Sequence, residues 1–131
     1  MSCPKLERVT FPRSLEIIGV CAFGGCTQLK EVELPNSVKT LNDGAFLQCD
    51  NLEKVTLSDG IETMGTYIFQ KCYNLKSVTI SGGVKTLTEG LFMDCHALTQ
   101  VEMKEGVENI GLGAFFNCSD LASITIPQSV K

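Results

Sequence analysis

Residues 44–57 read GAFLQCDNLEKVTL, in which an Ala-Phe pair and a cysteine are followed by Leu-x-x-Val-x-Leu. The same order returns as AFGGCTQLKEVEL at residues 22–34 and as AFFNCSDLASITI at residues 114–126. One pattern that occurs three times indicates a chain built from internal repeats, and these have to be identified before any secondary structure is assigned.

The repeat length is 23 residues, because the first leucine of the pattern recurs at that interval without insertion. We divide the chain into a partial repeat 1–5, full repeats 6–28, 29–51, 52–74, 75–97 and 98–120, and a partial repeat 121–131. We expect these units to form one solenoid over residues 1–131, a fragment of a longer array. Three columns mark the units: Leu6, Leu29, Leu52, Leu75, Leu98 and Leu121; Phe23, Phe46, Phe69, Phe92 and Phe115; Cys26, Cys49, Cys72, Cys95 and Cys118.

Each repeat changes its apolar spacing halfway along. In Leu52-x-x-Val55-x-Leu57, the last two apolar residues are two apart, which predicts a short strand with one face turned inward. From Leu41 to Cys49 the apolar residues are four, one and three apart, which predicts a helical segment of about two turns. Asn42 and Thr88 are expected to cap such helices. The fold class is therefore an α/β repeat solenoid, in which stacked strands form a parallel sheet.

The unit L-x-x-V-x-L-P-x-S-V-x-x-I-G-x-x-A-F-x-x-C resembles the BspA-type leucine-rich repeat, and residues 19–26 (GVCAFGGC) and 111–118 (GLGAFFNC) match it well. The resemblance covers nearly the whole chain. It implies a right-handed coil with a parallel sheet on the concave face and short helices on the convex face. It also implies a surface or secreted protein that serves adhesion or protein interaction, without shared catalytic residues.

Composition excludes several other classes of function. A net charge of −4 leaves no basic face for a phosphate backbone, so we expect no nucleic-acid partner. No apolar run approaches the length of a membrane span, so we expect no membrane insertion. The first residues, MSCPKLERVTF, contain no apolar core of a signal peptide.

Seven cysteines and one histidine raise the question of a metal site or a nucleophile. Cys3 and the cysteine column recur once per repeat, so their side chains should form a row spaced about 5 Å apart instead of converging on one ion. Parallel side chains at that spacing also fit a disulfide poorly, so reduced, buried thiols are expected. Cys95 and His96 are adjacent in sequence and point in different directions on a helix, which disfavours a catalytic dyad. We predict no metal, no cofactor and no enzymatic activity.

Charged residues alternate in sign along the stack, as in Glu16, Lys39, Glu62, Lys85 and Glu108. Successive coils place these residues side by side, so the alternation removes a repulsion and adds weak pairing, worth about 0–1 kcal/mol for each exposed pair. Such columns favour a self-neutralising surface over a binding site for a charged ligand.

The outward positions of the predicted sheet become less charged toward the C-terminus. A strip of hydroxyl and amide groups there could bind a protein loop or a glycan, and the alternative is a structural spacer or self-assembling solenoid without a ligand. The apolar residues of the first and last coils should also face water, which predicts end-to-end self-association. The candidate binding residues are Lys54, Thr56, Ser77, Thr79, Gln100, Glu102, Ser123 and Thr125.

Overall fold

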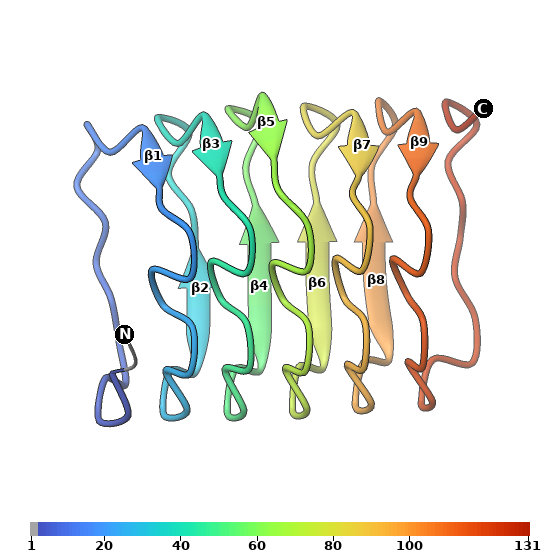
Figure 1. Ribbon diagram of the computed structural model, residues 1–131. Coiled ribbons are helices and arrows are strands. Elements are labelled where there is room, and N and C mark those ends of the chain that lie inside the picture. The colour runs from blue at the N-terminus through green and yellow to red at the C-terminus, as the bar shows by residue number, and fades with distance from the viewer. Residues whose placement is uncertain (1–2) are drawn as a thin grey trace.

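The computed structural model describes residues 3–131 as one stack of coils, with one coil for each 23-residue repeat (Figure 1). Each coil lies beside its sequence neighbours only, so nearly all long-range contacts join residues one repeat apart. Two rows of parallel strands run along the stack, a row of longer strands on one side and a row of two-residue strands on the other. The N- and C-terminal coils lie at opposite ends.

The longer strands form a four-stranded parallel sheet in the order β2-β4-β6-β8. They are β2 (Glu31–Glu33), β4 (Lys54–Leu57), β6 (Ser77–Ile80) and β8 (Gln100–Met103). Val55 pairs with Val32 on one side and with Val78 on the other. Each residue therefore pairs with the residue at the same position of the neighbouring repeat. The strands predicted from the Leu-x-x-Val-x-Leu pattern are confirmed in these four repeats, whereas residues 6–11 and 121–126, which carry the same pattern, form no strand.

The shorter strands are a second element, which the sequence analysis did not predict. They are β1 (Ile17–Ile18), β3 (Thr40–Leu41), β5 (Thr63–Met64), β7 (Thr86–Leu87) and β9 (Asn109–Ile110). They form a three-stranded sheet β1-β3-β5 and a two-stranded sheet β7-β9. The parallel pairing runs within each sheet, but β5 and β7 are not paired with each other.

The prediction of short helices is wrong, because residues 3–131 contain consecutive turns where helices were expected. The N–H groups of Gly44, Phe46 and Gln48 donate to carbonyls of the next coil, while those of Ala45 and Leu47 close turns within their own coil. Gly44 and Gln48 also have φ values of 60° and 58°, which a right-handed helix cannot contain. The apolar spacing of four, one and three therefore comes from successive turns.

The predicted helix caps have another role. The Asn42 side-chain amide donates to the Ile18 carbonyl of the preceding coil at 3.1 Å. The Thr88 hydroxyl donates to the Gly65 carbonyl at 2.6 Å. These short polar side chains satisfy backbone groups across the stack, where a capping residue would satisfy them within its own segment.

The core consists of columns, each made of the residues at one position of successive repeats. The phenylalanine column comes from the segments of consecutive turns. Phe46, Phe69 and Phe92 have no exposed surface. Their rings lie nearly parallel, with centroids 5.3 Å apart between Phe46 and Phe69 and 5.5 Å apart between Phe69 and Phe92. Both separations lie in the favourable range for aromatic pairs, so one ring type can fill the same place in every coil.

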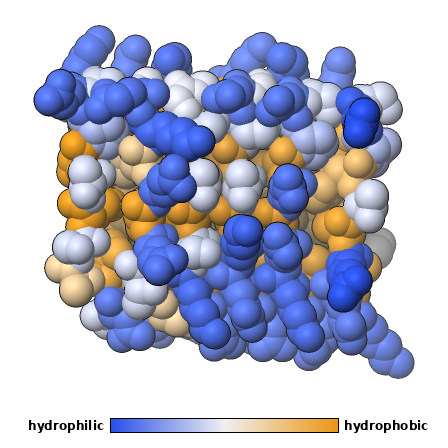
Figure 2. Space-filling model, turned by 180° about the vertical axis from the view of Figure 1, so that it is seen from behind, coloured by the Kyte–Doolittle hydropathy of each residue, from blue (hydrophilic) through white to orange (hydrophobic). Residues whose placement is uncertain are grey.

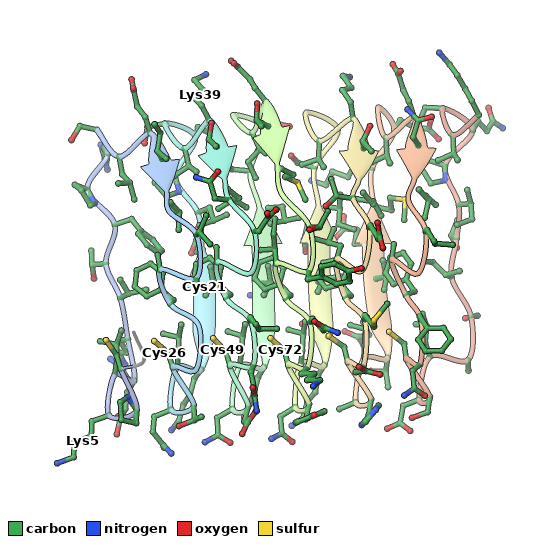
Figure 3. The ribbon with its side chains drawn as sticks, in the orientation of Figure 1. Lys5, Cys21, Cys26, Lys39, Cys49 and Cys72 are labelled. Atoms are coloured by element: carbon green, nitrogen blue, oxygen red, sulfur yellow. The ribbon has the colours of Figure 1, made fainter. Side chains whose placement is uncertain are left out.

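The cysteine column lies beside the phenylalanines, and Figure 3 shows Cys26, Cys49 and Cys72 in one row, with Cys21 off it. The Cys49 thiol donates to the Phe23 carbonyl at 3.2 Å, and the Cys95 thiol donates to the Phe69 carbonyl at 3.3 Å. All seven cysteines are free, and the five of the column are buried. Cys3 is exposed and Cys21 half-buried, so Cys3 is the more accessible thiol.

Phe69→Ala is expected to lower the free energy of unfolding by about 3–5 kcal/mol, because it leaves a cavity between two stacked rings in the middle of the core. Urea denaturation followed by circular dichroism measures the effect. The matched control is Phe116→Ala, since Phe116 is 62% exposed and its loss should change the free energy by less than about 0.5 kcal/mol. Equal effects of the two substitutions would contradict the assigned core.

The thiol column is expected to make stability depend on pH above 9. Burial raises the pKa of the Cys118 thiol from 9.0 to about 11, and burial also raises the pKa of Cys95 and Cys72. Thiols of the unfolded chain ionise near 9.0 while the buried thiols stay protonated, so the stabilisation is complete below that pH and is lost as the pH rises through about 11.

Urea denaturation at a series of pH values from about 7 to 11 measures this loss. Lysine and tyrosine side chains also titrate in this range, so Cys118→Ala serves as the reference. The decline should be shallower in that variant than in the natural chain. An identical decline would show that the Cys118 thiol does not contribute.

Candidate functional site

The outward side chains of the four-stranded sheet form the candidate site. Because side chains alternate along a strand, Val55 and Leu57 of β4 point into the core while Lys54 and Thr56 point outward. Figure 2 views the molecule from this side, where pale and blue residues of intermediate and high hydrophilicity lie over orange hydrophobic ones. The face therefore presents polar groups on a rigid apolar support.

A groove of about 600 Å³ lies on the C-terminal part of this face, and we call it the sheet groove. The pairing of β6 with β8 places Ser77 beside Gln100 and Thr79 beside Glu102. Neighbouring strands in a sheet are about 4.8 Å apart, so polar groups follow one another at that interval along the stack. The lining residues are Lys54, Ser77, Val78, Thr79, Thr99, Gln100, Val101, Glu102, Ser123, Ile124 and Thr125.

The sheet groove brings together all the residues proposed from the sequence except Thr56. Thr56 lies on β4 with Lys54 and pairs with Thr79, but it is half-buried and does not line the groove. Ser123 and Thr125 line the groove from the last coil, in a segment that has no strand. The sequence analysis missed Thr99, although it stands where the other coils carry Glu7, Lys30, Glu53 and Lys76, and that change of residue type was the available signal.

The electrostatics of the groove are mixed. Lys54 supplies one cation and Glu102 one carboxylate, and both side chains are exposed. Between them, the hydroxyl groups of Ser77 and Thr79 and the amide of Gln100 can each donate and accept hydrogen bonds. The ion pairs that residues 3–131 do form, Lys39 with Glu62 and Lys131 with Glu108, lie away from the groove. The arrangement suits a neutral polar ligand better than a strongly charged one.

The cysteine and histidine residues form no reactive pair. The Cys95 thiol points to the Phe69 carbonyl in the core, whereas the His96 ring stacks on Tyr73 at the surface with ring centroids 5.3 Å apart. Among the described residues, no three or more His, Cys, Asp or Glu side chains are grouped so that they could hold a metal ion. No helix in residues 3–131 has the length and apolar character of a membrane span.

Comparison with known proteins identifies relatives with the same architecture. Residues 1–122 match the family described as "BspA type Leucine rich repeat region (6 copies)". No curated protein matches the chain.

Three solved structures share the fold. A leucine-rich repeat protein from T. pallidum is 30% identical with a TM-score of 0.70, over 92% of this chain and 67% of that one. One from Eubacterium ventriosum is 24% identical with a TM-score of 0.75, over 91% of this chain and 38% of that one. A leucine-rich cell surface protein from Faecalibacterium prausnitzii is 22% identical with a TM-score of 0.56, over 92% of this chain and 41% of that one.

The structural similarity agrees with two features of this chain. Its parallel sheet pairs residues one repeat apart, and its apolar core is made of columns. The family match extends over more than nine-tenths of the sequence and covers all five full repeats. The chain therefore belongs to the BspA-type leucine-rich repeat family.

Proposed function

We propose that this chain is a non-enzymatic binding module, and that its ligand is a protein or a glycan that lies in the sheet groove. The observation that carries the proposal is the regular row of hydroxyl and amide groups along β6 and β8, held in register by the parallel pairing. An extended ligand running along the stack would meet a polar pair at every coil. The strands fix the backbone positions of these groups, and the short Ser and Thr side chains lose little rotamer freedom on binding.

We also propose that the module acts outside the cell. One structural relative is described as a leucine-rich cell surface protein. The present chain spans only 41% of that relative, so the proposal concerns the module and not the whole protein to which it belongs.

Substituting Ser77, Thr79 and Gln100 together by alanine is expected to abolish ligand binding without unfolding the chain, because all three line the groove and point away from the core. Arrays of glycans and of extended peptides, probed with the natural chain and with the triple variant, measure the effect. Arg8→Ala with Thr10→Ala provides the control, since these exposed residues occupy the same columns in the first coil, outside the groove. Binding that survives in the triple variant would show that the ligand does not lie in the sheet groove, whereas a natural chain that binds no probe would favour the spacer function.

A second proposal is that the 131-residue polypeptide self-associates end to end through its first and last coils. Ile126 of the last coil is 46% exposed, and Phe11 and Leu121 are only partly covered. Segments 6–11 and 121–126 carry no paired strands, and apart from bonds at Leu6, Glu7 and Leu121 their main-chain groups have no hydrogen-bond partner within residues 3–131. These groups can therefore continue the stack.

Light scattering over a wide range of concentration is expected to show a mass that rises with concentration for the natural polypeptide. Ile124→Lys or Phe11→Glu should abolish the rise, because a charge would be buried at the contact between two copies. Leu112→Glu is the control, since Leu112 is 81% exposed and lies in a turn of the fifth repeat. A constant monomeric mass for the natural polypeptide would contradict the proposal.

A further inference from the structure

The row of short strands is interrupted between β5 and β7, where Figure 1 shows a wider separation than between the other short strands. Across the preceding junction, the N–H groups of Glu62 and Thr63 donate to the Lys39 carbonyl, and that of Gly65 donates to the Leu41 carbonyl. The same three bonds form at the β1–β3 and β7–β9 junctions. The interruption is therefore a local feature of one junction in an otherwise regular stack.

At the β5–β7 junction both walls keep their polar groups without a partner. The N–H groups of Lys85, Thr86 and Thr88, which correspond to the three donors, have no hydrogen-bond acceptor within residues 3–131. Facing them, the carbonyls of Glu62 and Met64 accept no bond from the described part of the chain. One wall of the junction thus offers free donors and the other wall offers free acceptors.

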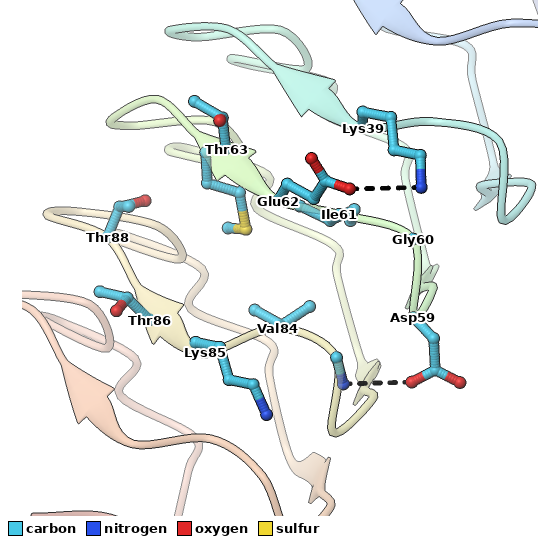
Figure 4. Close-up of a pocket in the computed structure, with 12 residues that line it drawn as sticks. Lys39, Asp59, Gly60, Ile61, Glu62, Thr63, Val84, Lys85, Thr86 and Thr88 are labelled. Carbon is cyan, nitrogen blue, oxygen red and sulfur yellow. Dashed lines mark hydrogen bonds and ion pairs between the residues drawn. The ribbon is translucent and has the colours of Figure 1, made fainter.

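A cavity of about 640 Å³ occupies this junction, and we call it the slit (Figure 4). Its deepest residues are Ile61 and Val84, which are 4% and 2% exposed and provide an apolar floor. In Figure 4, Glu62 and Thr63 lie on one side and Lys85 and Thr86 on the other. The outer rim therefore carries hydroxyl groups and charged groups above an apolar base.

Both ends of the slit are closed by side-chain hydrogen bonds. At one end the Asp59 carboxylate accepts from the Gly83 N–H at 3.1 Å, and at the other the Thr88 hydroxyl donates to the Gly65 carbonyl at 2.6 Å. A polypeptide strand inserted between β5 and β7 would have to pass both ends. The slit therefore admits a short pendant group from the side and not a continuous chain.

The geometry points to a binding site for the acetamido group of an N-acetylated sugar. The carbonyl of that group accepts from the free N–H groups of Lys85 and Thr86, and its N–H donates to the Glu62 carbonyl. Its methyl packs on Ile61 and Val84, where it leaves water. The sugar ring stays outside, where the hydroxyl groups of Thr63 and Thr86 can bond to its own hydroxyl groups.

The probes are N-acetylglucosamine, glucosamine, and N-acetylalanine N-methylamide, a peptide with the same amide chemistry. Each is titrated into the isotopically labelled chain while amide chemical shifts and hydrogen exchange are recorded by NMR. N-acetylglucosamine is expected to shift the amide signals of Lys85 and Thr86 and to slow their exchange, while glucosamine leaves both unchanged. No response to N-acetylglucosamine, or an equal response to glucosamine, would overturn the proposal. A tighter response to the peptide would overturn the assignment to a sugar.

The amides of Ser77, Thr79 and Gln100 are followed in the same spectra, so binding in the sheet groove is read separately from binding in the slit. The proposed function and the slit proposal can then fail independently.

Thr86→Pro removes the N–H and the hydroxyl of Thr86 from the slit, so the Lys85 amide reports on the sugar in this variant, and Asn109→Pro is the matched control at the same position of the next repeat. The Asn109 N–H donates to the Lys85 carbonyl, so Asn109→Pro should lower the unfolding temperature, whereas Thr86→Pro should leave it nearly unchanged and abolish the response to the sugar. Equal destabilisation by the two substitutions would show that the Thr86 N–H is already bonded, and would overturn the proposal. If Thr86→Pro does not fold, the exchange rates of the natural chain decide the matter.

Discussion

The main-chain hydrogen bond between one coil and the next is the interaction on which this structure depends. A coil of 23 residues has few hydrogen bonds of its own beyond short turns, so its remaining N–H and C=O groups must find partners one repeat away. Such bonding requires each residue to lie beside its counterpart in the neighbouring coil, as Val55 lies beside Val32 and Val78. Side chains at the same position of successive repeats therefore stack on one another, which explains the columns of leucine, phenylalanine and cysteine. The thiol suits this role because it is small and apolar and still donates to a buried carbonyl.

The sequence was sufficient to predict the repeat length, the long strands and the buried columns, because each rests on a periodicity that the fold must respect. It was misleading in the second half of each repeat. The spacing of Leu41, Ala45, Phe46 and Cys49 fits one face of a helix, but it fits a chain of turns equally well. Backbone conformation separates the two, and Gln48 with its φ of 58° carries no sequence signal comparable to that of Gly44.

The candidate site was predictable in part for the same reason. Alternation along a strand identifies Ser77, Thr79 and Gln100 as outward residues, but the boundaries of a groove depend on how neighbouring strands are placed. The interruption between β5 and β7 was not predictable. Thr63 and Thr86 are the same residue in the same column, yet one N–H group is bonded across its junction and the other is free. One difference in this part of the stack is Tyr67, which stands where other repeats have Gly44, Gly90 and Gly113. Its ring packs against Gly90 and its hydroxyl donates to Glu89.

The interrupted row also bears on how cooperatively the array folds. In a linear stack, stability is close to a sum of terms for each unit and for each contact between adjacent units. The contact between the third and fourth full repeats lacks, on its short-strand side, three main-chain bonds that the contacts on either side of it have, while β4 and β6 still pair across it. Thermal motion would therefore open the short-strand side of the stack here before it opens that side at the β1–β3, β3–β5 or β7–β9 junctions. A chain of nearly identical units thus acquires one preferred place for local opening, on the side of the stack where the short strands lie.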